Sequence, residues 1–554
     1  MSNSLMAAVS GLQGHQKMLD VAGNNLANVN SYGFKSSRVT FAELLSETVT
    51  EATQPSAQVG GTNPQQIGSG VTVASIDRNM GQGTMVHTGQ PLDMAIEGAG
   101  YFVLSDGQKD AYTRVGTFAV DSEYQLVDPG TGYRVRRLGI EGVSEGFQNP
   151  SSDDIRIPYD VALPAEATRT VSFTGNLSAD VGTPTTNEMT SGVQYTDEGA
   201  VAESETLLAD LDQTSGVSDG ETISIIGKAP DGTDVSDTFT VGTGAGQDGN
   251  TLGDIVDKVS SAFSGAEARL VNGEIRLLDD EAGYSQTDIY MTYNGVGSFE
   301  LPAYFRHLAA GGEQAKSANV EIFDAQGIGH VVSLAFVRTE DADTWDMVVT
   351  NMTGDVWFDG AEDRRLCKIQ FNPDGSFAGL GGATPDDQDI KVRFGSAAAT
   401  QSTIDIDYGT IGQFDGLSQF GGKSTVAASG QDGYEAGYLS SLSVSRDGVL
   451  VGMFTNGVRR NIAALRIATF QNPAGLQATG QSYFTTSGNS GDPMPTHALT
   501  GGAGAVNGGS LERSNVDTAE EFVNLIQAQN GFQANARTIT VTNDMLRELS
   551  NLIR

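Results

Sequence analysis

The sequence predicts a mixed, mainly β protein with a long helix at each terminus. Apolar residues recur every seven positions in both terminal stretches, which is the period of a helical packing seam. Between them, short runs alternate apolar and polar residues and are separated by Asp-Gly and Asn-Gly pairs, as expected for strands joined by tight turns. With 554 residues, of which 70 are glycine, the chain has room for several cores. We therefore expect two or three stacked antiparallel β domains and a coiled-coil-like tail made by the terminal helices.

The C-terminal helix is expected to begin at Thr518, because Thr518 followed by Glu521 has the form of a capping box. A helix of about 35 residues from this point is about 50 Å long. Its apolar seam consists of Leu525, Phe532, Ile539, Leu546 and Ile553. Ala528 and Leu549 belong to a second row that Asn535 and Thr542 interrupt. Gly531 and the β-branched run at 538–542 disfavour an isolated helix, so we expect it to become ordered on assembly.

The N-terminal stretch carries a matching pattern. Leu5, Leu12, Leu19 and Leu26 lie seven residues apart, and a second row follows three residues after each, with Ala8, His15, Ala22 and Val29. The helix is expected to stop near Asn30, because Gly33 suits a left-handed C-terminal cap. Two weak helices with the same spacing favour pairing within a polymer, and an intramolecular helical hairpin on a globular body is the alternative.

Charge and targeting signals narrow the function classes. The formal net charge is −37, most of it between the terminal helices, which makes nucleic acid an unlikely partner and predicts solvated, mutually repelling surfaces. The alternative is an acidic soluble protein whose charge has no functional role. The single cysteine, Cys367, excludes an intramolecular disulfide. No secretory signal or membrane-length apolar run is found, so the residues alone favour a cytoplasmic protein.

Several chemical motifs fail on inspection. Residues 244–249 fit G-x-G-x-x-G, but the neighbouring strands alternate with polar residues and are not the buried parallel strands that a dinucleotide site requires. Residues 416–423 miss the phosphate-loop spacing, and the acidic pair at 210 and 212 lacks the terminal glutamate of an EF-hand. The five histidines are scattered, and Cys367 is expected to be a small core residue. We predict no catalytic, cofactor or metal site and no enzyme activity.

Several stretches resemble a known family. AGNNLANVNSYGFK (Ala22–Lys35) and SNVDTAEEFVNLIQAQNGFQANARTIT (Ser514–Thr540) are similar to the terminal signatures of bacterial flagellar rod and hook proteins. The resemblance continues through QPLDMAIEGAGYFVL (Gln90–Leu104) and DGYEAGYLSSLSVSRDGVLVGMFTNG (Asp432–Gly457). The size of the chain and the DGYEAGYL block resemble the hook members of the family rather than the shorter rod members. One departure is the turn at Asp121–Tyr124, where the family often places a glycine.

The resemblance and the sequence pattern together divide the chain into five parts. These are a helical assembly tail (1–35 and 514–554), an extended connector (36–73 and 488–513), an inner β domain (74–157 and 395–487), a second β domain (158–180 and 305–394) and an inserted outer domain (181–304). The connector is expected to include a flexible link at 500–509, and the insertion is expected to contain one helix at 251–263.

The resemblance implies a structural subunit that assembles into the curved tubular hook, a flexible joint that transmits torque from rod to filament. It implies as partners other copies of the chain, the distal rod, the hook cap scaffold, the hook–filament junction protein and the flagellar export apparatus. It also implies an extracellular location reached by type III export without a cleaved signal peptide. The alternatives are a distal rod component or, from a different class, a secreted monomeric adhesin or surface-layer protein.

The expected assembly interface combines the two apolar seams with the asparagine-rich corner after the first helix. It consists of Leu5, Leu12, Leu19, Asn24, Asn25, Leu26, Asn28, Val29 and Gly33, and of Phe522, Leu525, Phe532, Ile539, Leu546, Leu549 and Ile553.

Overall fold

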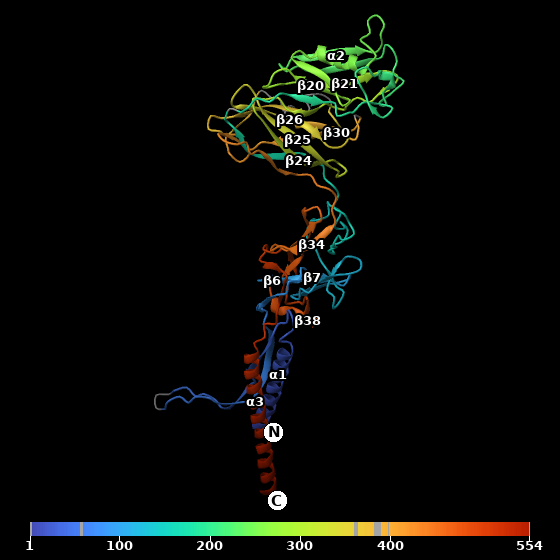
Figure 1. The fold of residues 1–554 in the computed structure, drawn as a ribbon. Coiled ribbons are helices and arrows are strands. Elements are labelled where there is room, and N and C mark those ends of the chain that lie inside the picture. Colours follow the sequence, from blue (N-terminus) through green and yellow to red (C-terminus); the bar gives the residue numbers. More distant parts are fainter. Residues whose placement is uncertain are drawn as a thin grey trace. The chain divides into compact units, whose positions relative to one another are not determined.

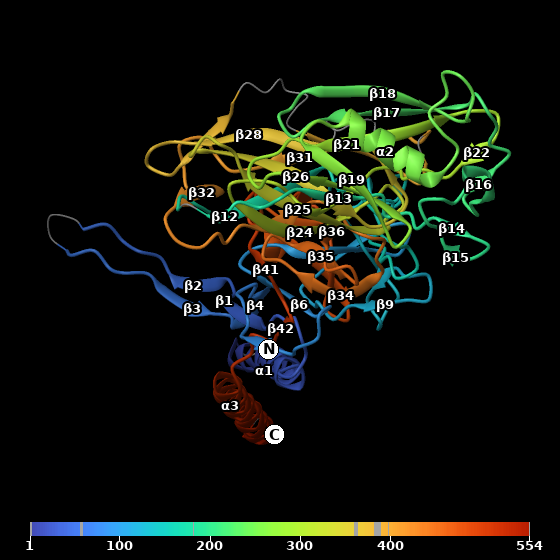
Figure 2. The ribbon, with the colours of Figure 1, turned by 45° about the horizontal axis from the view of Figure 1, so that its top comes forward.

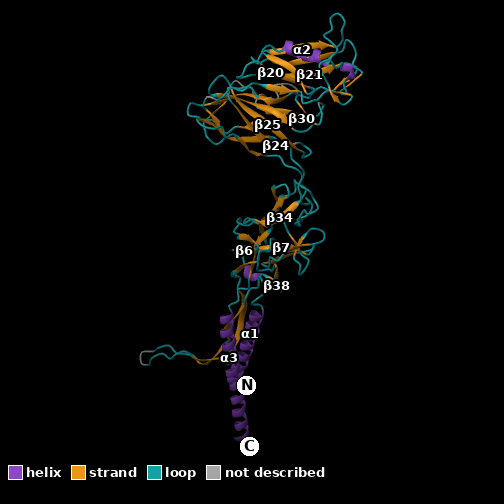
Figure 3. Cartoon of the chain, in the orientation of Figure 1, coloured by secondary structure: helices purple, strands orange, loops and turns teal. Residues whose placement is uncertain are grey.

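A computed structural model describes residues 3–55, 59–180, 182–358, 364–381, 389–396 and 398–552. The candidate interface residue Ile553 and the side chain of Cys367 lie outside this description. Strands predominate within it, and the α-helices are α1 (Asn3–Ala27), α2 (Leu252–Ala262) and α3 (Thr518–Leu552) (Figure 3). The mainly β fold class with terminal helices is therefore confirmed. The chain divides into two compact units, residues 1–163 with 437–554 and residues 164–436.

In the first unit, α1 and α3 lie side by side and run antiparallel (Figure 1). The helix α3 begins at Thr518 as predicted, but its first amides are capped by Asp517, whose Oδ1 accepts from Ala519 N–H at 2.8 Å. The capping-box interpretation of Thr518 is therefore wrong. The helix α1 ends at Ala27, so Gly33 is not its cap. Gly33 does have a positive φ of 64°, and its N–H donates to Glu512 O at 2.8 Å.

The predicted connector consists largely of paired strands. The strand β1 (Ser37–Glu43) pairs with β4 (Val71–Arg78), and β2 (Ser46–Thr50) pairs with β3 (Gln65–Gly68) in an arm that extends away from the helices (Figures 1 and 2). On the return, β41 (Ala505–Gly508) pairs with β6 (Met94–Glu97), and β42 (Ser510–Glu512) pairs with β5 (Met85–His87). The flexible link expected at 500–509 is therefore wrong in part, because β41 lies within it. Its backbone groups are satisfied by a sheet partner distant in sequence.

The rest of the first unit is built from short antiparallel strands. A central sheet has the order β38-β39-β8-β7-β11-β10-β9, with β37 between β7 and β40, and a second sheet has the order β34-β35-β36. Their bounds are β7 (Tyr101–Ser105), β8 (Asp110–Thr113), β9 (Ala119–Val120), β10 (Leu126–Val127), β11 (Arg134–Val135), β34 (Leu439–Val444), β35 (Val449–Phe454), β36 (Arg459–Ala464), β37 (Ile467–Thr469), β38 (Gln477–Gly480), β39 (Tyr483–Thr485) and β40 (Met494–Thr496). Tyr124, in the turn before β10, has a positive φ of 62°, so a side chain occupies a backbone conformation that glycine adopts more readily.

In the second unit, two sheets enclose one core. One has the order β27-β30-β31-β12-β32, with β33 also on β12, and the other has the order β24-β25-β26-β28-β29. Their bounds are β12 (Thr170–Ser178), β24 (Ala315–Phe323), β25 (Gly329–Arg338), β26 (Thr344–Met352), β27 (Val356–Trp357), β28 (Arg365–Phe371), β29 (Phe377–Leu380), β30 (Asp389–Phe394), β31 (Ser402–Asp407), β32 (Leu417–Phe420) and β33 (Ala427–Gln431). Both sheets contribute to the same buried cluster, and we call this part the sandwich.

Two expectations for the sandwich are corrected. The strand β12 pairs in parallel with β31 and β32, so the sheet is not purely antiparallel. A long intervening chain makes parallel pairing feasible, since parallel strands need a long crossover connection. The strands β31 to β33 also belong here and not to the inner domain, because Ile404, Leu417 and Val426 lie in the sandwich core.

The segment from β13 to β23 (Glu188–Ala309) forms a second core in this unit, and we call it the inserted segment. Its strands are β13 (Glu188–Thr190), β14 (Thr196–Asp197), β15 (Ala200–Val201), β16 (Thr214–Ser215), β17 (Thr222–Lys228), β18 (Asp234–Thr240), β19 (Ala266–Val271), β20 (Glu274–Asp279), β21 (Asp288–Asn294), β22 (Ser298–Phe299) and β23 (Arg306–Ala309). The helix α2 lies where the pattern predicted one, with a capping box between Thr251 and Asp254. Because β23 pairs with β13, the segment ends about five residues later than expected.

Candidate assembly interface

The contact between the terminal helices is made by small side chains. Ala8, Gly11 and Ala22 are buried on α1, as is Gly14, which faces Phe41 of β1. The predicted leucine row (Leu5, Leu12, Leu19 and Leu26) is only half-buried. A methyl group added at Gly11 would lie 2.8 Å from Asn535 Nδ2, and one added at Gly531 would lie 2.4 Å from His15 Nε2. The helices therefore approach closely through a face that is rotated from the leucine seam.

On α3, the predicted seam has two different environments. Ala528 is fully buried, and Leu525, Phe532 and Ile539 are half-buried along α1. From Asn543 to Asn551 every residue is exposed, including Leu546 at 50% and Leu549 at 57%. Phe522 is also exposed. The structure thus partly covers the proximal seam residues and leaves the distal ones exposed within the chain.

Among the asparagines of the corner, Asn25 is buried. Its Nδ2 donates to Glu521 Oε1 and to Ser37 O, both at 2.8 Å, and its Oδ1 accepts from Ser37 N–H at 2.9 Å. Asn25 therefore joins α1, α3 and β1. Asn28 bonds locally, donating to Asn24 O at 2.9 Å, and Asn24 is exposed. Leu26 and Val29 are half-buried.

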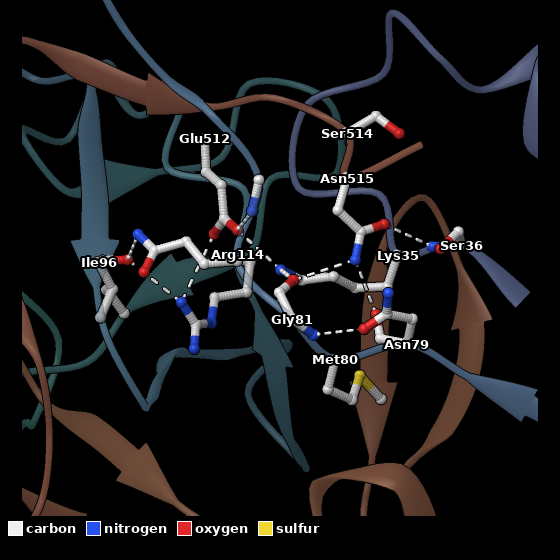
Figure 4. A network of polar contacts seen from close by, with 12 residues as sticks. Lys35, Ser36, Asn79, Met80, Gly81, Ile96, Arg114, Glu512, Ser514 and Asn515 are labelled. Atoms are coloured by element: carbon white, nitrogen blue, oxygen red, sulfur yellow. Dashed lines mark hydrogen bonds and ion pairs between the residues drawn. The ribbon is translucent and has the colours of Figure 1, made fainter. Parts of the chain in front are cut away.

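Beneath the helices lies a buried ionic group that the sequence analysis missed (Figure 4). Lys35 Nζ lies 2.7 Å from Glu512 Oε1, with 1% and 0% of their side chains exposed. Arg114 Nη1 lies 3.5 Å from Glu512 Oε2. Burial lowers the pKa of Lys35, and the adjacent Glu512 carboxylate opposes that shift. We call Lys35, Arg114 and Glu512 the root.

Further hydrogen bonds support the root. Glu512 Oε1 accepts from Gly83 N–H at 2.8 Å, and Lys35 Nζ donates to Gly81 O at 2.8 Å. Arg114 Nη2 donates to Gly98 O at 2.7 Å, and its guanidinium lies 5.1 Å from the centre of the Tyr101 ring. Buried charges are tolerated only when they are paired and hydrogen-bonded, as these are.

Asn515 extends the polar network from the root to α3 (Figure 4). Its Oδ1 accepts from Ser36 N–H at 2.8 Å, and its Nδ2 donates to Asn79 O at 2.9 Å. The chain segments that leave α1 and enter α3 are thus held to each other and to the β body. The sequence signal was that Lys35 closes one resembling stretch and Asn515 is the second residue of the other, but their partners elsewhere in the chain are not visible in either stretch.

Neither metal chemistry nor a membrane span is indicated in the part of the chain that the structure describes. No three His, Cys, Asp or Glu side chains gather there as metal ligands would. No helix described there is long and apolar enough to cross a bilayer.

Four family models match the chain. They are described as "Flagella basal body rod protein" (residues 5–35), "Flagellar hook protein FlgE/F/G D1 domain" (95–179), "Flagellar basal body protein FlaE D2 domain" (299–434) and "Flagellar basal body rod FlgEFG protein C-terminal" (507–552). The terminal models coincide with α1 and α3, and all four describe axial proteins of the bacterial flagellum.

Full-length relatives are more specific. The flagellar hook protein FlgE of Borreliella burgdorferi is 30% identical over 567 residues, and that of Treponema pallidum is 31% identical over 558 residues, each match covering 100% of both chains. The crystal structure of Helicobacter pylori flagellar hook protein FlgE2 is similar over 76% of this chain and 99% of that chain, at 18% identity and a TM-score of 0.39, a score too low to support a conclusion about the fold. The chain belongs to the flagellar hook protein family.

The function that follows is that of a structural subunit of the flagellar hook, located in the hook and basal body. The rod alternative is not favoured. The flagellar basal-body rod protein FlgG of Bacillus subtilis is 45% identical, but over only 138 residues, which are 25% of this chain and 52% of that one.

Proposed function

We propose that the chain polymerises with copies of itself into the curved tube of the hook and transmits torque from rod to filament while the tube bends. The observation that carries this proposal is the distal part of α3. There Val541, Met545, Leu546 and Leu549 are at least half exposed, on a helix that extends past the partner α1. Clustered exposed apolar side chains of this kind mark association surfaces.

The terminal helices are proposed to form a coiled-coil-like tail at the inner wall of the tube. The proximal interface residues Leu525, Phe532 and Ile539 would hold α3 to α1 within one subunit. Leu546, Leu549, Phe522 and Ile553, with the outer faces of Leu5, Leu12, Leu19 and Leu26, would meet neighbouring subunits. The corner around Asn24, Asn25, Asn28, Val29 and Gly33 would set the angle at which the tail leaves the body.

The charge distribution supports different roles for the tail and the β bodies when the tube bends. The acidic body would carry most of the net charge of −37, so neighbouring bodies repel and stay hydrated at their lateral contacts. The apolar tail contacts are insensitive to that repulsion. We propose that the tail supplies the stiff axial contact and that the β bodies slide past one another, with the inserted segment outermost.

The remaining partners follow from membership of the family. They are the distal rod, the hook cap scaffold, the hook–filament junction protein and the flagellar export apparatus, with type III export to the cell exterior and no cleaved signal peptide. Helices as weak in intrinsic propensity as α3 suit passage through a narrow channel in an extended form.

Electron microscopy of the purified chain under polymerising conditions tests this function. We expect curved, bendable tubes. Straight, stiff rods would favour a distal rod component. Limited proteolysis of the monomer provides the second test, with rapid trimming of about 30 N-terminal and about 40 C-terminal residues expected from the marginal stability of helices that lack their partners. A monomer that forms no tubes and resists protease at both ends would favour an adhesin or surface-layer protein.

A further inference from the structure

The inserted segment and the sandwich meet at two consecutive arginines before and at the start of β28. Arg364 is 2% exposed, and its guanidinium forms a two-point ion pair with Asp288, the first residue of β21 in the inserted segment. Its Nη1 also donates to Phe305 O at 2.5 Å, and its guanidinium lies 5.4 Å from the centre of the Tyr304 ring. A planar guanidinium satisfied on both edges fixes the direction as well as the distance between the elements that it joins.

Arg365 makes a second connection. Its Nη2 donates to Ser285 O of the inserted segment at 2.8 Å, and its Nε donates to Asp346 Oδ2 of the sandwich at 3.2 Å. Tyr284 crosses the same junction, because its hydroxyl donates to Asp346 Oδ2 at 2.6 Å. Asp346 is fully buried, so the carboxylate that accepts the bonds from Arg365 and Tyr284 is itself shielded from water.

One residue of the inserted segment enters the sandwich core. Tyr304 packs there, whereas the next residue, Phe305, packs in the core of the inserted segment. Arg364 contacts both residues. The ion pair of Arg364 is therefore formed beside a side chain that already joins the two cores.

We infer that Arg364 and Arg365 lock the inserted segment onto the sandwich, so that the two turn as one rigid body. Two separate cores in one chain can reorient relative to each other unless polar contacts fix the direction of their junction. With the lock, displacement at the surface of the inserted segment is passed to the sandwich without loss. This inference concerns the isolated chain and holds whether or not it polymerises.

Spin labels on the full chain test the lock. Labels at Ser236 in the inserted segment and Glu321 in the sandwich, both exposed, are introduced in a Cys367→Ser background. We expect one narrow distance distribution, and in D288N/Y284F a distribution at least about twice as wide. D288N removes the charge opposite Arg364, and Y284F removes the bond to Asp346. The matched control is R269M, an exposed arginine of the same segment that pairs with Glu267.

Each result of this experiment either supports the lock or contradicts it. A wide distribution in the unaltered chain, or an equally narrow one in D288N/Y284F, overturns the lock. Unfolding of the whole unit in D288N/Y284F, detected by fluorescence of the buried Trp345, would also count against it, because the contacts would then support both cores and not their junction. Y284F alone keeps every charge, and an intermediate width in that variant supports the lock.

Discussion

Lys35 and Glu512 are separated by 477 positions in the sequence and form a 2.7 Å ion pair that is sealed from solvent. The pair joins the segment after α1 to the strand before α3, and Arg114 adds the β body. Both ends of the chain are therefore tied to one buried carboxylate. The position of the tail depends on this pairing.

Substitution of Glu512 by Gln should destabilise the first unit by about 3 kcal/mol, since it leaves two buried cations without a counter-charge. Hydrogen exchange of β7 and β42 measures the loss. The control is Glu51→Gln at an exposed position, expected to change stability by less than about 0.5 kcal/mol. Equal exchange rates in the two variants would show that the root does not stabilise the first unit.

The close helix approach predicts opposite effects for one substitution at two glycines. Gly23 lies in α1 with open space around it, so Gly23→Ala should stabilise by about 0.5 to 1 kcal/mol through helix propensity. Gly531→Ala places a methyl group against His15. We therefore expect it to give no stabilisation or to destabilise the contact between α1 and α3. Amide exchange in both helices distinguishes the cases, and equal stabilisation at both sites would contradict the proposed packing.

The exposed distal seam predicts a separation of folding from assembly. Leu546→Asp should leave monomer stability within about 0.5 kcal/mol of the original and abolish polymerisation, because Leu546 is half exposed in the single chain. Circular dichroism and light scattering give the two readings. Ser550→Asp adds the same charge one turn away and should still polymerise. If the two variants polymerised to the same extent, an apolar contact at Leu546 would be contradicted.

A buried histidine predicts acid sensitivity in the second unit. Burial lowers the pKa of His307 to about 3, below its ordinary value of 6.5. As the pH falls, the unfolded chain therefore binds a proton at this histidine before the folded chain does. The free energy of unfolding decreases as pH drops from about 6.5 toward 3. His307→Gln should flatten this dependence in urea titrations followed by tryptophan fluorescence. An unchanged slope would mean that other groups control acid unfolding.

Local signals predicted the helices well. The position of α2 was correct, because its capping box and apolar period act within a few residues. The helix α3 begins at Thr518 as predicted, although Asp517 and not Thr518 caps it. The pattern placed two rows on α1, the leucines and a second row that includes Ala8, His15 and Ala22. The structure buries Ala8 and Ala22 and leaves the leucines half-buried, because both rows share the seven-residue period and only the partner decides which is covered.

Contacts between residues far apart in the chain could not be predicted from the sequence. The parallel pairing of β12 with β31 depends on a chain return of more than two hundred residues. The root and the Arg364–Asp288 pair likewise join residues whose neighbours in sequence give no sign of a partner. The resemblance identified the terminal stretches but not the contacts between them.

The most direct test is hydrogen exchange of residues 541–549 in monomer and polymer. We predict rapid exchange in the monomer, where these residues lack a covering partner apart from the buried Thr542, and at least about a hundredfold slower exchange in the polymer. Equal protection in the two states would contradict the proposal that neighbouring subunits cover the distal part of α3.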